Sequence, residues 1–87
     1  MPPVALSAET VEKAWRKLAE WVELDQHEAA LQAGDATVLG PDPFRQAFAR
    51  EYQRFGAATM KKLCYFLDLL PEERRRFYQQ WLERALT

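Results

Sequence analysis

The sequence predicts an all-α protein: a small helical bundle with two long antiparallel helices and a shorter C-terminal helix packed across them. Apolar residues recur every three or four positions along most of the 87 residues, which is the period of an amphipathic helix. Asp, Pro and Gly stand where such helices would begin or end. No segment shows the alternation of apolar and polar residues that indicates a strand. The length allows one domain with a limited core.

The first predicted helix covers residues 8–33. Ser7 can cap its N-terminus, and Gly34 is suited to end it. An alternative is a break near Asp25, because Asp25-Gln26-His27-Glu28 has the form of a capping box that could restart the helix. The expected buried face of the uninterrupted helix consists of Val11, Ala14, Trp15, Leu18, Val22, Ala29 and Ala33.

The second predicted helix covers residues 43–70 and begins at Asp42-Pro43, a capping carboxylate followed by proline. Its apolar stripe keeps its phase across Gly56, which favours one uninterrupted helix about 42 Å long. The alternative is a break near residues 56–58. The stripe consists of Phe44, Phe48, Tyr52, Phe55, Thr59, Leu63, Phe66 and Leu70.

The remaining segments complete a single domain over residues 1–87. Pro71 ends the second helix and favours the start of a third, which we expect over residues 72–86. Two prolines and no periodic pattern predict a flexible arm at residues 1–6. Two glycines and a proline predict a loop at residues 34–42.

Composition narrows the cell type and compartment that we expect. The sequence has no Ile and no Asn, and Arg outnumbers Lys eight to four, a bias typical of a GC-rich, bacterial genome. The single cysteine, Cys64, excludes an internal disulfide and fits the cytoplasm. The first residues lack the basic and apolar regions of a secretory signal, and no segment has the ~20 apolar residues of a membrane span.

Candidate catalytic residues do not form a recognisable set. His27 is the one histidine, Ser7 is the one serine and is better placed as a helix cap, and Cys64 lies between apolar neighbours. The sequence contains no glycine-rich phosphate loop and no nucleophile motif. We therefore expect neither an enzyme nor a bound metal or cofactor.

Basic residues suggest contacts with an anionic partner. The chain around Gly56 fails as a helix-turn-helix, because Tyr52 stands where such motifs place a small residue and Lys62 where they place an apolar one. Residues 1–35 carry seven acids and three bases, whereas residues 36–87 carry six acids and nine bases. The acidic first helix could neutralise the bases, so we expect no nucleic-acid binding and keep it as the alternative function. The bases concerned are Arg50, Arg54, Lys61, Arg74, Arg75 and Arg76.

Apolar residues away from the expected buried faces suggest a protein interface. Trp21 would lie at the edge of the apolar face of an uninterrupted first helix. Leu24 and Leu31 would lie almost opposite that face, although a break near Asp25 would rotate Leu31 inward. Tyr78 and Leu82 widen the apolar face of the third helix. We therefore expect a small interaction module, an adaptor or regulator of another protein that also forms homo-oligomers.

Overall fold

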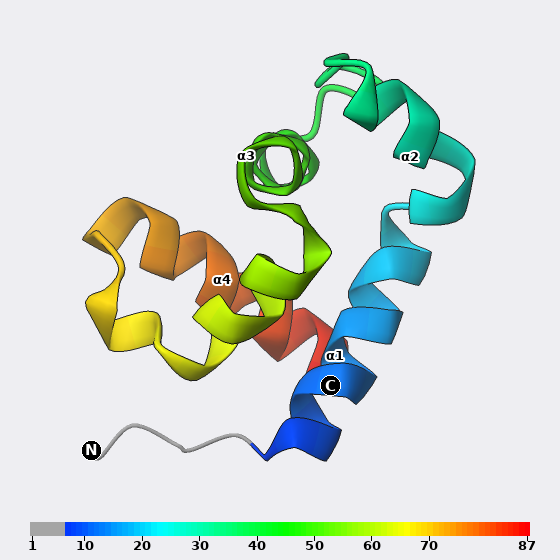
Figure 1. Cartoon of the computed structure of the whole chain (residues 1–87). Coiled ribbons are helices and arrows are strands. Elements are labelled where there is room, and N and C mark those ends of the chain that lie inside the picture. The colour runs from blue at the N-terminus through cyan, green and yellow to red at the C-terminus, as the bar shows by residue number, and fades with distance from the viewer. Residues whose placement is uncertain (1–6) are drawn as a thin grey trace.

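The computed structural model describes residues 7–87 and confirms the all-α class (Figure 1). The first predicted long helix is divided into two, and the second stays one helix with a kink at Gly56, so the described chain holds four α-helices where three were expected. A short 3₁₀ helix, η1, precedes the last of them. The elements are α1 (Ala8–Trp21), α2 (Leu24–Gln32), α3 (Pro43–Tyr65), η1 (Leu67–Leu69) and α4 (Glu72–Leu86). The predicted arm at residues 1–6 lies outside the described residues.

The first predicted helix is wrong as a single element, because the chain breaks between α1 and α2, close to the alternative break near Asp25. The cap at its start is confirmed, since the Ser7 hydroxyl accepts a hydrogen bond from the Thr10 amide at 3.1 Å. Glu23 adopts a left-handed conformation with φ 55° and ψ 49°, which ends the helical path two residues before Asp25. The turn brings Leu31 to full burial and leaves Ala29 and Ala33 exposed.

The second predicted helix begins as expected, but it follows the alternative of a break near residues 56–58 and ends before residue 70. The Asp42 carboxylate accepts a hydrogen bond from the Phe44 amide at 2.9 Å, which confirms the cap. Gly56 has φ 80° and ψ 168°, and the two halves of α3 on either side of it run in different directions (Figure 1). An uninterrupted helix over residues 43–70 would be about 42 Å long. The described part of the chain extends 38 Å along its longest axis, which is less than that length.

Aromatic side chains form the centre of the core. The Phe48 ring centre lies 5.6 Å from that of Trp15 in α1 and 5.5 Å from that of Trp81 in α4. Trp81 is also 4.9 Å from Tyr78. The predicted bounds of the last helix are confirmed, and α4 packs against α1 so that the C-terminus lies beside α1 (Figure 1).

Candidate interaction surface

Four of the five residues expected to contact a protein partner are buried within the described chain. Leu31 is 0% exposed, Tyr78 1%, Leu82 6% and Leu24 8%. The expectation that they form an outer surface is therefore wrong. The break at Glu23 is the physical reason for Leu31, because α2 turns its face towards α3, where the Gln53 side-chain amide donates a hydrogen bond to the Leu31 carbonyl.

Trp21, the fifth of these residues, is half-buried and connects three helices. The guanidinium of Arg45 in α3 lies 5.1 Å from its ring centre, and that of Arg84 in α4 lies 4.5 Å from it. Each contact lies within the range of a cation–π interaction. The Trp21 ring is therefore used to join the end of α1 to the other two helices.

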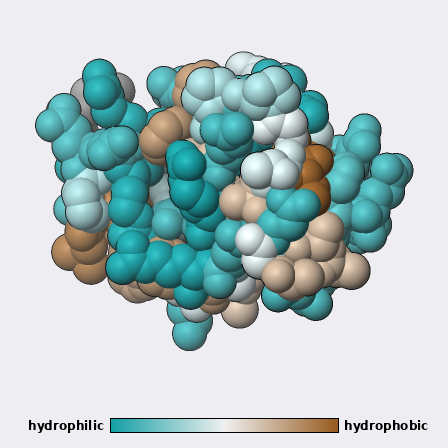
Figure 2. Space-filling model, turned by 90° about the horizontal axis from the view of Figure 1, so that it is seen from above, coloured by the Kyte–Doolittle hydropathy of each residue, from teal (hydrophilic) through white to brown (hydrophobic). Residues whose placement is uncertain are grey.

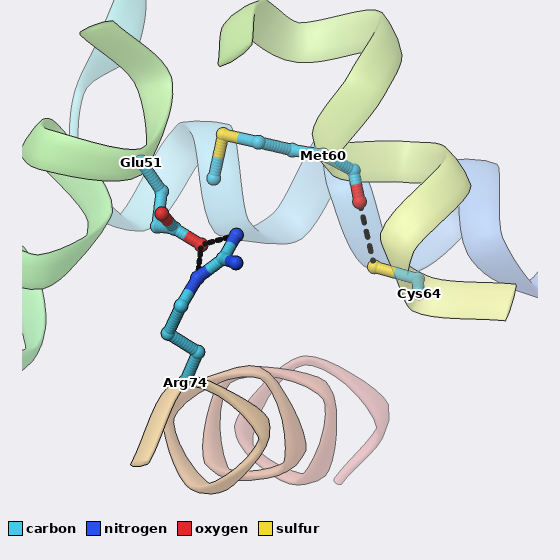
Figure 3. Close-up of polar contacts among 4 residues, drawn as sticks. All are labelled: Glu51, Met60, Cys64 and Arg74. Atoms are coloured by element: carbon cyan, nitrogen blue, oxygen red, sulfur yellow. Dashed lines mark hydrogen bonds and ion pairs between the residues drawn. The ribbon is translucent and has the colours of Figure 1, made fainter. Parts of the chain in front are cut away.

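Two of the six predicted anion-binding residues are held by acids of the same chain. Lys61 Nζ lies 2.8 Å from Glu12 Oε1 of α1, which matches the expected neutralisation by the acidic first segment. Arg74 at the start of α4 donates two hydrogen bonds to Glu51 Oε1 of α3, at 2.7 and 2.9 Å (Figure 3). The Glu51 side chain is only 12% exposed, so this pair joins the two helices in partly buried surroundings.

The other four arginines have no such partner. Among residues 7–87, no carboxylate lies within 4.0 Å of Arg50, Arg54, Arg75 or Arg76. Arg54 lies 5.0 Å from the ring centre of Phe55, and Arg50 lines a surface groove of about 190 Å³ between α3 and α4. Glu51 and Glu73 line the same groove, so its charge is mixed.

The nucleophile candidate Cys64 is inert by its surroundings. It is 7% exposed, and its thiol donates a hydrogen bond to the Met60 carbonyl at 3.4 Å (Figure 3). Burial raises the pKa of Cys64 to about 11, so the thiol is protonated at neutral pH. The His27 ring nitrogen Nδ1 lies 3.0 Å from the Glu23 carbonyl, at the break between α1 and α2.

Tyr78 is the second buried group with a strongly shifted pKa. Burial and, to a lesser degree, the negative charge of Glu51 raise the pKa of Tyr78. The Glu51 carboxylate hydrogen-bonds Arg74, and the Tyr78 hydroxyl has no hydrogen-bond partner among residues 7–87. A neutral hydroxyl in this position is part of the packing between α3 and α4.

The sequence interpretation missed an exposed apolar corner between α3 and α4, formed by Tyr65, Phe66 and Leu69 and called here the α3–α4 corner. Leu69 is 79% exposed, Phe66 56% and Tyr65 42%. The face of the molecule in Figure 2 is mainly hydrophilic, with apolar residues in separate areas. The prediction failed because a helix extended to residue 70 places Phe66 on its buried stripe.

A local signal for the corner is present in the sequence. The run Leu67-Asp68-Leu69-Leu70 precedes Pro71, and a helix that must end before proline cannot turn three leucines in four residues towards one core. The structure buries Leu70, half-buries Leu67 and exposes Leu69.

Comparison with known proteins identifies no relative of this chain. Searches of the chain against protein-family models, curated proteins and solved structures find no match.

Among residues 7–87, no group of three or more His, Cys, Asp or Glu side chains is placed to hold a metal ion. None of the helices in this range combines the length and the apolar character needed to cross a bilayer.

Proposed function

We propose that this protein is a small non-catalytic interaction module, an adaptor or regulator that binds another protein chain through the α3–α4 corner. The observation that carries the proposal is the exposure of Tyr65 at the end of α3, of Phe66 directly after it, and of Leu69 in η1. With these exposed fractions, three such side chains present roughly 400 Å² of mainly apolar surface. Patches of that size on a monomer often bind a partner.

The surroundings of the corner support a contact surface with a polar rim. Lys62 lies one turn before Phe66 on α3, and Asp68 lies within η1. Both side chains are exposed. An apolar centre with charged residues at its edge is the usual composition of a protein interface.

Site-specific photo-crosslinking tests the proposal. A photoreactive phenylalanine analogue at position 69 should crosslink to a protein partner in the host cell. The matched control is the same analogue at Gln26, an exposed residue of α2 far from the corner (Figure 1). Equal crosslinking from both positions, or none from position 69, would contradict the proposal.

A second candidate function is association with nucleic acid through the basic residues. The observation in its favour is that Arg50, Arg54, Arg75 and Arg76 have no carboxylate within 4.0 Å among residues 7–87. The mixed charge of the groove beside Arg50 opposes it. We expect no binding to duplex or single-stranded nucleic acid at ~150 mM salt, measured by fluorescence anisotropy. Tight binding that weakens steeply with salt, and is lost when Arg50, Arg54 and Arg75 are each changed to Glu, would favour this second function instead.

A further inference from the structure

We propose that the partner at the α3–α4 corner is a second copy of this chain, docked by a two-fold axis that passes through the corner. This inference rests on the proposed interaction function and specifies its partner. In a two-fold interface the same surface of both copies takes part, so the surface must be complementary to itself. The corner meets that condition in its apolar centre and in its charges.

The apolar centre is complementary to itself because it carries no formal charge. Tyr65, Phe66 and Leu69 would face their own symmetry mates across the axis. Their combined surface of roughly 400 Å² per copy is about half of what each partner buries in a standard stable complex. The apolar centre alone therefore gives a weak dimer, and the rim must add both area and specificity.

The rim supplies one exposed charge of each sign. Lys62 precedes the apolar centre and Asp68 lies within it. Neither has an oppositely charged side chain within 4.0 Å among residues 7–87. The neighbouring Lys61 differs, because it is bound to Glu12 of its own chain.

These charges favour a second copy over a strongly acidic or basic partner. A partner of one sign would be attracted by one rim residue and repelled by the other. In a two-fold dimer Lys62 of each copy meets Asp68 of its mate, so the dimer contains two favourable pairs. We expect a dissociation constant on the order of 100 µM, because the apolar area is small.

Charge exchange between copies tests the arrangement. The mass of the unmodified protein should rise from 10.2 kDa towards twice that value between about 10 µM and about 1 mM in sedimentation equilibrium. Lys62→Glu and Asp68→Lys should each weaken the dimer at least tenfold, because each variant places like charges opposite one another in its own homodimer. An equimolar mixture of the two variants should recover association within about threefold, because the heterodimer restores two pairs of opposite charge.

Control variants separate these charges from charge in general and from folding. Lys17→Glu makes the same change on an exposed residue of α1 and should leave the dimer unchanged. Leu69→Ser should abolish association without changing any charge. Circular dichroism and urea unfolding of every variant should match the unmodified protein, because all four side chains are exposed.

Each failure has a distinct meaning. A mass of 10.2 kDa throughout the range overturns the dimer, whereas crosslinking of a different protein from position 69 would still support the interaction function. A dimer that is unaffected by Lys62→Glu, Asp68→Lys and Leu69→Ser uses another surface and also overturns the inference. Loss of association in both charge variants without recovery in the mixture overturns the two-fold pairing of Lys62 with Asp68.

Discussion

Replacing Gly56 by alanine should destabilise the protein by about 1–2 kcal/mol, although the same change in a continuous helix would stabilise it. Gly56 has φ 80° and ψ 168°, a region that residues with a Cβ almost never occupy and that costs them roughly 1–3 kcal/mol. An added Cβ would meet no atom within 4 Å, so backbone strain is the whole penalty. Alanine also restricts the unfolded chain, which offsets about 0.4–1 kcal/mol of that strain.

The sign of the change distinguishes the two paths that the sequence allows. If residues 43–70 formed one helix, Gly56→Ala would stabilise the protein by about 1 kcal/mol through helix propensity alone. In the interrupted helix, the loss should lower the midpoint of urea unfolding by roughly 1 M, given a slope of about 1–2 kcal/mol per M for a small domain. A midpoint that rises would refute the interruption at Gly56.

D-alanine at the same position gives the matched control. Total chemical synthesis is practical for a chain of 87 residues. The mirror image of φ 80° and ψ 168° lies in the extended region, so a D-residue adopts it without strain. We therefore expect D-alanine to equal or exceed glycine in stability, whereas L-alanine lowers it. Equal losses for both would indicate a steric cause and not a conformational one.

The remaining predictions concern the core and the two buried polar features. Phe48→Ala and Trp81→Ala should each lower the free energy of unfolding by about 3–5 kcal/mol in urea titrations, because the two side chains are 0% and 2% exposed. A loss below about 1 kcal/mol would contradict their place at the centre of the core. Arg74→Met should cost about 1–3 kcal/mol by the same measurement, because it leaves the Glu51 carboxylate unpaired at 12% exposure, and adding Glu51→Gln should recover part of the loss. Burial raises the pKa of Cys64 from 9.0 to about 11, so at pH 8 the folded thiol should react with a disulfide reagent roughly 100-fold more slowly than the urea-unfolded chain. Because the pKa of Cys64 is raised in the folded chain, the neutral thiol contributes its full stability below pH 9, and this contribution is lost as the pH rises to about 11. Cys64→Ala should therefore reduce the decrease in the free energy of unfolding between pH 9 and about 11.

The sequence predicted those helix ends that depend on local chemistry. The Ser7 and Asp42 side chains cap their helices as expected, and Pro71 separates η1 from α4, whose bounds match the prediction. Each of these signals acts within three residues through one hydrogen bond or one fixed backbone angle, so it can be recognised without knowledge of the tertiary fold.

The two breaks within the predicted helices were anticipated only as alternatives, near Asp25 and near residues 56–58, because no local signal decided in their favour. Phe55 and Thr59 keep the helical spacing across Gly56, and a periodic pattern does not record a change of direction at a single residue. Glu23 takes a left-handed conformation that Gly or Asn normally adopts, so the residue at the break does not itself mark the break. The capping box at Asp25 was close to the break but did not form, since α2 has no side-chain cap.

Two of the predicted interface residues, Leu24 and Leu31, failed for the same reason, because an error in helix direction exchanges an inner face for an outer one. Leu31 was expected outside and is fully buried after the turn at Glu23. Phe66 was expected inside and is 56% exposed, because α3 ends at Tyr65. Candidate surfaces in short helical chains therefore depend on the positions of breaks more than on composition.

The end of α3 also explains why we place the partner at this corner. The chain passes from Tyr65 to Glu72 through a single 3₁₀ turn, which directs Leu70 into the core and Leu69 away from it. A leucine that is 79% exposed contributes little to the stability of its own chain, and a polar residue there would keep the same turn with less tendency to aggregate. The apolar character of this position is useful once another chain covers it. A second copy is the partner that the opposite charges of Lys62 and Asp68 would admit without repulsion.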